Sequence, residues 1–110
     1  DQVRWTSTTL AIPPAPHLNE DGLLRIVDDP EASKLDRGIA ATNLAWLRRC
    51  LNGDQLAVSC LQLGPASIVH LPGEAVVEYQ LFAQDLAPDA FVAVAAYGDY
   101  GTGYICLEEH

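Results

Sequence analysis

At 110 residues, with 49% hydrophobic content, the chain is long enough for one domain with a modest core. It carries 15 acidic and 6 basic residues, for a formal net charge of -9, and Arg48-Arg49 is its densest basic pair. Because binding to phosphate backbones needs clustered Lys and Arg, this balance argues against a nucleic-acid partner and disfavours anionic membranes. No apolar run reaches the roughly 20 residues that span a bilayer, so we expect no transmembrane segment.

Cysteine and methionine usage adds two expectations. The three cysteines form no CxxC pair, which argues against a disulfide framework or a cysteine-rich zinc site. We expect buried free thiols, although a Cys50–Cys60 or Cys60–Cys106 bridge stays open. The chain has no methionine and starts at Asp1, so we expect one α+β domain over residues 1–110 that is a fragment of a longer protein.

The first half predicts one strand and two helices. Residues 3–12 are rich in Val, Thr and Trp, which is typical of a strand, and their imperfect alternation predicts a bulge or bend near residues 7–9. After a proline-rich connector, Asn19 is expected to cap a helix over residues 20–27. Ser33 begins a capping-box-like start, and the helix that follows should run to Leu51 and end at Asn52-Gly53.

The second half predicts a hairpin, a helix and a last strand. Residues 55–63 and 67–71 read as strands joined by a turn at Gly64-Pro65. A helix is expected from Glu74 to Leu86, with Phe82 turned inward and Gln84 outward. Residues 91–96 are all apolar, which is typical of a central strand buried on both faces. The order β-α-α-β-β-α-β predicts an α+β fold, with a mixed sheet of about four strands and helices packed on it.

Two places could carry chemistry. Glu74 is either a first-turn glutamate of its helix or a carboxylate ligand at a strand-to-helix turn. The loop over residues 97–104 has three glycines and three tyrosines around Asp99, and it lacks the Lys or Arg of a phosphate-binding loop. Its tyrosines pack on the core, or its glycines allow close approach of another group. His70 is expected to be a half-buried strand histidine, and neither His17 nor His110 has a partner in sequence.

The chain contains no GxSxG or other nucleophile signature, so we assign no catalytic residue. Its motifs do carry a resemblance. The run IVHLPGE (68–74), a helix, the run VAVAAYGDYGTGYI (92–105) and Glu108-Glu109 together resemble the latter part of the catalytic domain of neutral/alkaline, non-lysosomal ceramidases. The likeness is greatest to ceramidase-like proteins of bacteria. It covers residues 64–109 and is looser over residues 3–53.

The resemblance implies a zinc-dependent amidohydrolase that is secreted or periplasmic. In that family two histidines, a glutamate and a tyrosine hold zinc, which activates a water for attack on an amide carbonyl. The glutamate of the PGE element falls on Glu74, and the tyrosine before the isoleucine falls on Tyr104. No position here matches the family's histidines, so the rest of the parent chain is the implied partner. The fragment should bind zinc weakly and be inactive in isolation.

The chain also departs from the family. Ala75-Val76-Val77 follow the PGE element in place of a threonine and an arginine-rich helix start, and Cys106-Leu107 replace the usual threonines. A lipid-like amide other than ceramide is therefore left open as substrate. Two other readings remain: a non-catalytic α+β module for packing or partner binding without metal, and a local metal site of His70, Glu74 and Tyr104. The sequence also leaves a homo-oligomer open.

Overall fold

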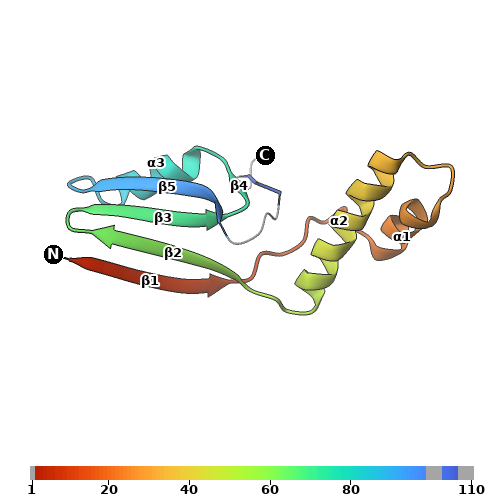
Figure 1. Ribbon diagram of the computed structural model, residues 1–110, viewed down its shortest axis with the longest axis horizontal. Coiled ribbons are helices and arrows are strands. Elements are labelled where there is room, and N and C mark those ends of the chain that lie inside the picture. Colours follow the sequence, from red (N-terminus) through yellow and green to blue (C-terminus); the bar gives the residue numbers. More distant parts are fainter. Residues whose placement is uncertain (1, 99–102, 107–110) are drawn as a thin grey trace. The chain divides into compact units, whose positions relative to one another are not determined.

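The computed structural model describes residues 2–98 and 103–106, and its elements are shown in Figure 1. It contains helices together with a mixed four-stranded sheet, which confirms the predicted α+β class. Contacts divide the chain into two compact units. A helical unit comprises Ala11–Gln55, and a sheet unit comprises the described residues up to Leu10 and from Leu56 onward. The helical unit is thus inserted in the sequence between two strands of the sheet unit.

The helical unit consists of α1 (Glu20–Asp28) and α2 (Lys34–Leu51), and both predicted caps are confirmed. The Asn19 side chain accepts a 2.8 Å hydrogen bond from the amide of Gly22. Ser33 Oγ accepts from the amide of Asp36 at 3.0 Å and donates to its carboxylate at 2.6 Å. These bonds satisfy backbone donors that a helix leaves unpaired in its first turn. The predicted end of α2 is also confirmed, with Asn52 as C-cap and Gly53 at φ 81°.

A small core joins the two helices. Leu23 of α1 packs with three residues of α2, and partly buried side chains flank the cluster: Ala40, Leu44 and Leu47, with Leu18, Leu24 and Val27 around them. Arg48 of α2 forms a 2.8 Å ion pair with Glu20 of α1. Arg37 donates from Nε to the carbonyl oxygen of Val27 at 2.9 Å. Apolar residues beyond this narrow stripe stay exposed, among them Leu35 at 72%.

The sheet unit has the strand order β1-β2-β3-β5. Its strands are β1 (Val3–Leu10), β2 (Leu56–Leu63), β3 (Ala66–Pro72) and β5 (Phe91–Gly98). β1 and β3 run antiparallel to β2, so the predicted hairpin is confirmed, and its turn has Gly64 at φ 56°. β5 lies parallel to β3 after a crossover through α3 (Glu78–Asp85), which contacts β5 (Figure 1).

Two strand predictions were wrong in detail. β1 ends at Leu10 and pairs in a continuous register without a bulge, from Val3 opposite Leu63 to Leu10 opposite Leu56. Its alternation is weak because β1 is an edge strand whose residues are all exposed, so no face was selected for burial. β5 is also an edge strand of the described sheet rather than a central one. Its apolar sequence is typical of parallel strands that a crossover helix covers.

The third helix also differs from the prediction, because it begins at Glu78 and Glu74 lies in a short strand, β4 (Glu74–Ala75). Gln84 was expected to face outward, yet its side chain donates to the carbonyl oxygen of Val92 at 3.1 Å. Phe82 was expected to face inward and is 63% exposed. The Tyr79 hydroxyl donates to the carbonyl oxygen of Cys106 at 3.2 Å, which ties α3 to the chain beyond β5.

The three cysteines are free thiols. Cys50 and Cys60 are half-buried and Cys106 is exposed, so burial is only partial. Burial raises the pKa of the Cys50 thiol above its ordinary value, although neighbouring Arg49 opposes the shift. In the part of the chain that the structure covers, no helix is both long and apolar enough to cross a membrane.

Candidate metal centre

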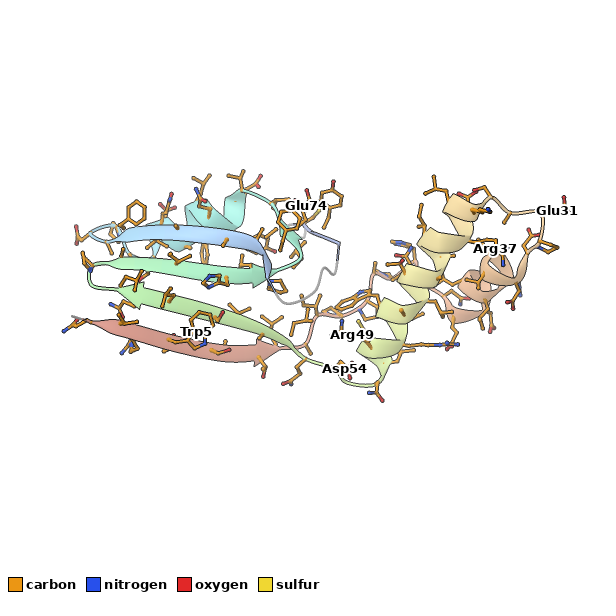
Figure 2. The ribbon with its side chains drawn as sticks, in the orientation of Figure 1. Trp5, Glu31, Arg37, Arg49, Asp54 and Glu74 are labelled. Carbon is orange, nitrogen blue, oxygen red and sulfur yellow. The ribbon has the colours of Figure 1, made fainter. Side chains whose placement is uncertain are left out.

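A second, two-stranded sheet brings the two predicted ligands together. β4 pairs in parallel with β6 (Tyr104–Ile105), and Glu74 lies directly opposite Tyr104. Figure 2 shows Glu74 on β4 in the sheet unit. Opposite residues on neighbouring strands lie about 4.8 Å apart and project to the same side. The carboxylate and the phenol that the sequence places far apart are therefore neighbours in the fold.

Backbone hydrogen bonds explain why Glu74 leaves the predicted helix. Its amide donates to the carbonyl oxygen of Gly103 at 2.8 Å, and the amide of Val76 donates to Ile105 at 3.2 Å. These long-range bonds use the donors that a helix starting at Glu74 would leave unpaired. Glu74 is consequently no helix-start residue, and the interpretation of its carboxylate as a first-turn helix group was wrong.

Each candidate ligand follows a glycine with a positive φ. Gly73 precedes Glu74 at φ 66°, and Gly103 precedes Tyr104 at φ 76°. A residue with a Cβ adopts this left-handed backbone at a cost, whereas glycine adopts it freely. The two glycines therefore allow the backbone turns that lead into β4 and β6. The residue after each glycine, Glu74 or Tyr104, carries the oxygen-bearing side chain.

Tyr97 joins the pair from the end of β5. It is a non-glycine residue at positive φ (62°), a backbone state that costs about 1–3 kcal/mol. Its amide donates to the carbonyl oxygen of Gly73 at 2.7 Å. The neighbouring Glu74 carboxylate raises the pKa of the Tyr97 phenol above its ordinary value, with smaller contributions from desolvation and from Tyr104.

His70 contacts a different part of the sheet. It lies on β3 opposite Ser59, and its ring packs against that of Trp5 at a centroid distance of 5.4 Å. Its Nδ1 atom is buried without a hydrogen-bond partner. Within residues 2–98 and 103–106, no group of three His, Cys, Asp or Glu side chains is placed to hold a metal ion. His70 is therefore the half-buried strand histidine that the sequence predicts.

The small sheet carries two groups of a kind that zinc can bind, a carboxylate and a phenol. Zinc in proteins takes carboxylate oxygen at about 2.0–2.2 Å and is usually four-coordinate. Glu74 and Tyr104 place one carboxylate and one phenol opposite each other on β4 and β6. Residues 99–102 of the glycine-rich loop, Asp99 among them, lie outside the described residues, as do Glu108-Glu109 and His110.

Sequence reasoning identified Glu74 and Tyr104 but missed Tyr97 as their neighbour. Tyr97 stood within the predicted tyrosine-rich loop, yet its positive φ is invisible in a sequence because tyrosine rarely adopts it. The pairs Gly73-Glu74 and Gly103-Tyr104 were a usable signal, since a glycine precedes each candidate ligand.

Comparison with protein-family models, curated proteins and solved structures gave no match for this chain.

Proposed function

We propose that this chain is part of a zinc-dependent, ceramidase-like amidohydrolase and supplies two of its four metal ligands, Glu74 and Tyr104. In this proposal two histidines from elsewhere in the full-length protein complete the site. The substrate class is an amide, with a lipid-like acyl amide as the first candidate. The chain by itself is then inactive and binds zinc weakly.

One observation carries the proposal. The resemblance selects Glu74 and Tyr104 by their motifs alone, and the fold independently sets these two residues opposite each other in β4 and β6. Had the two motifs been structural turns only, nothing would require their carboxylate and phenol to be adjacent. The paired glycines that precede the ligands support the same conclusion.

The chain's own residues would hold the metal rather than transform the substrate. Two oxygens anchored on hydrogen-bonded strands form a rigid half-site, because Glu74 and Val76 are both tied to the β6 segment. Bound zinc would supply Lewis acidity and a water of lowered pKa for attack on the amide carbonyl. No nucleophile or general base is assigned to this chain.

The test measures zinc content and amidase activity of the full-length protein, with a fluorescent N-acyl amide of a long-chain amine as substrate. Glu74→Gln and Tyr104→Phe each remove one ligand with little change of shape. We expect both variants to bind zinc more weakly and to lose activity together, because each substitution removes one of the four proposed protein ligands. Glu78→Gln, a change in the first turn of α3, is the matched control and should retain both.

Full zinc occupancy in Glu74→Gln or Tyr104→Phe would contradict the ligand assignment. If the two variants lose zinc but the unmutated full-length protein has no amidase activity, the metal site is supported and the proposed reaction class is refuted. The two readouts therefore separate the site from the chemistry.

A second candidate is a partner-binding module without metal, and the outer surface of α3 favours it. Several large apolar side chains on and beside this helix are exposed: Val77, Leu81, Phe82 and Leu86. Contiguous exposed apolar residues are typical of interaction surfaces. This candidate predicts that Glu74→Gln changes neither metal content nor stability of the full-length protein, which is the opposite of the first proposal.

A further inference from the structure

The end of β5 leaves its regular pairing with β3 at the level of the PGE turn (residues 72–74). Between the pairs His70–Ala95 and Pro72–Gly98, β3 advances by two residues and β5 by three. The additional residue of β5 makes this a β-bulge, a feature that bends a strand and is frequent beside active sites. The bulge therefore lies directly before the segment that carries the candidate ligand of β4.

Two main-chain contacts connect the bulged end of β5 to this turn. The amide of Tyr97 donates to the carbonyl oxygen of Gly73 at 2.7 Å. Gly98 lies so close to Leu71 that a Cβ placed on it would be 3.1 Å from the Leu71 carbonyl oxygen, a distance tighter than nine in ten real Cβ contacts. The two contacts hold the residues on the N-terminal side of Glu74.

The backbone conformation at residue 98 does not by itself require glycine. Gly73 and Gly103 have positive φ, whereas Gly98 does not. A side chain at residue 98 would therefore be excluded by its neighbour and not by backbone strain. Glycine within a strand often marks a bulge or a place where another backbone approaches closely, and residue 98 meets both conditions. The close approach to Leu71 is thus the feature that depends on glycine.

We infer that the end of β5 is a main-chain clamp on the PGE turn and that Gly98 is a positioning residue for Glu74. The Gly98 backbone sets the position of Leu71, and the Tyr97 amide holds Gly73, so the residue that follows starts from a fixed point. The consequence for zinc rests on the proposed function, because it takes Glu74 as a ligand. Binding sites need their ligands held within about 0.5 Å of the productive geometry, so a small displacement is enough to weaken them.

The experiment introduces Gly98→Ala into the full-length protein and makes three measurements. Hydrogen exchange of residues 73–76, relative to the rest of the sheet, reports whether the turn has moved. Zinc affinity comes from competition with a chromophoric chelator, and ligand geometry from the visible spectrum of the cobalt(II)-substituted protein. Gly64→Ala is the matched control, because it makes the same substitution at the opposite end of β3, where a Cβ would meet no described atom within 4 Å and the cost is the strain of φ 56°.

We expect Gly98→Ala to exchange faster over residues 73–76, because the alanine Cβ displaces the Leu71 carbonyl and with it the turn. We also expect zinc binding to weaken about tenfold, the lower end of the range for lost support of a metal ligand, and the cobalt bands to shift. Gly64→Ala should lose stability and keep the parent affinity, spectrum and relative exchange.

Parent-like zinc affinity and cobalt spectrum in folded Gly98→Ala, together with weaker zinc binding in Glu74→Gln, would overturn the positioning role alone. An equal loss of affinity in Gly64→Ala would also overturn it, because the effect would then follow from lower stability. Full zinc occupancy in Glu74→Gln would overturn the proposed function, and the exchange of residues 73–76 would still decide whether the clamp holds the turn.

If Gly98→Ala does not fold, Tyr97→Asn decides the question. Asparagine tolerates the φ of 62° and keeps the amide that donates to Gly73, so a main-chain clamp predicts parent-like zinc affinity. Weaker zinc binding in folded Tyr97→Asn would refute a clamp that acts through the main chain.

Discussion

At the scale of single residues, the candidate site depends on backbone conformation as much as on side-chain chemistry. Gly73, Tyr97 and Gly103 all have positive φ, and they surround Glu74 and Tyr104. Strained or left-handed backbone is found where the surrounding structure holds a functional side chain in place. The chain thus concentrates unusual backbone around one carboxylate and one phenol.

Gly103→Ala tests this dependence directly. A Cβ at residue 103 would meet no atom of the described residues within 4 Å, so the expected effect is the strain of φ 76°. We expect a loss of about 1 kcal/mol in the free energy of unfolding, together with weaker zinc binding in the full-length protein. Gly64→Ala, which places similar strain at the hairpin turn with φ 56°, is the control and should lower stability without affecting zinc. If Gly103→Ala is destabilised but binds zinc as the parent does, the conformation of β6 does not contribute to zinc binding.

At the scale of secondary-structure elements, local sequence signals were enough to predict the helices of the helical unit and their ends. Asn19 and Ser33 cap helices where their side-chain chemistry predicts, and the Asn52-Gly53 pair ends α2. The long α2 (Lys34–Leu51) depends on Ser33 through two hydrogen bonds, one to the amide and one to the carboxylate of Asp36. A cap of this kind typically contributes about 1 kcal/mol.

Ser33→Ala should therefore lower the stability of the helical unit by roughly 1 kcal/mol, measured by urea unfolding followed through helical circular dichroism. Thr42→Ala is the matched control. The Thr42 hydroxyl bonds back to the carbonyl oxygen of Gly38 within the same helix, an interaction that adds little, so its loss should change stability by less than about 0.5 kcal/mol. Equal destabilisation by the two variants would refute the capping role of Ser33.

Elements that depend on distant partners were harder to predict. The sequence indicates the hairpin of β2 and β3 and the end of α2, because turn and cap chemistry is local. It placed Glu74 in a helix, because the pairing of Glu74 with Tyr104 and the amide bond to Gly103 are long-range. It also made β5 a central strand, since an apolar run does not reveal how many neighbours a strand has. Glu74 and Tyr104 were identified by motif resemblance, whereas the position of Tyr97 beside Gly73 is visible only in the fold.

At the scale of the whole molecule, the described residues leave much apolar surface uncovered. None of their side chains is less than 2% exposed, and Trp5, Phe82 and Phe91 are each more than half exposed. Exposed apolar surface of this extent is typical of regions that pack against other protein. This exposure supports the proposal that the chain is part of a longer protein.

The most direct test of the central claim is anomalous X-ray diffraction at the zinc edge from crystals of the full-length protein. The account predicts an anomalous peak about 2.0–2.2 Å from one carboxylate oxygen of Glu74, with the Tyr104 hydroxyl and two histidine nitrogens also bonded to the metal. A zinc ion bound to neither Glu74 nor Tyr104, or no zinc at all in protein crystallised with zinc present, would contradict the proposed metal site.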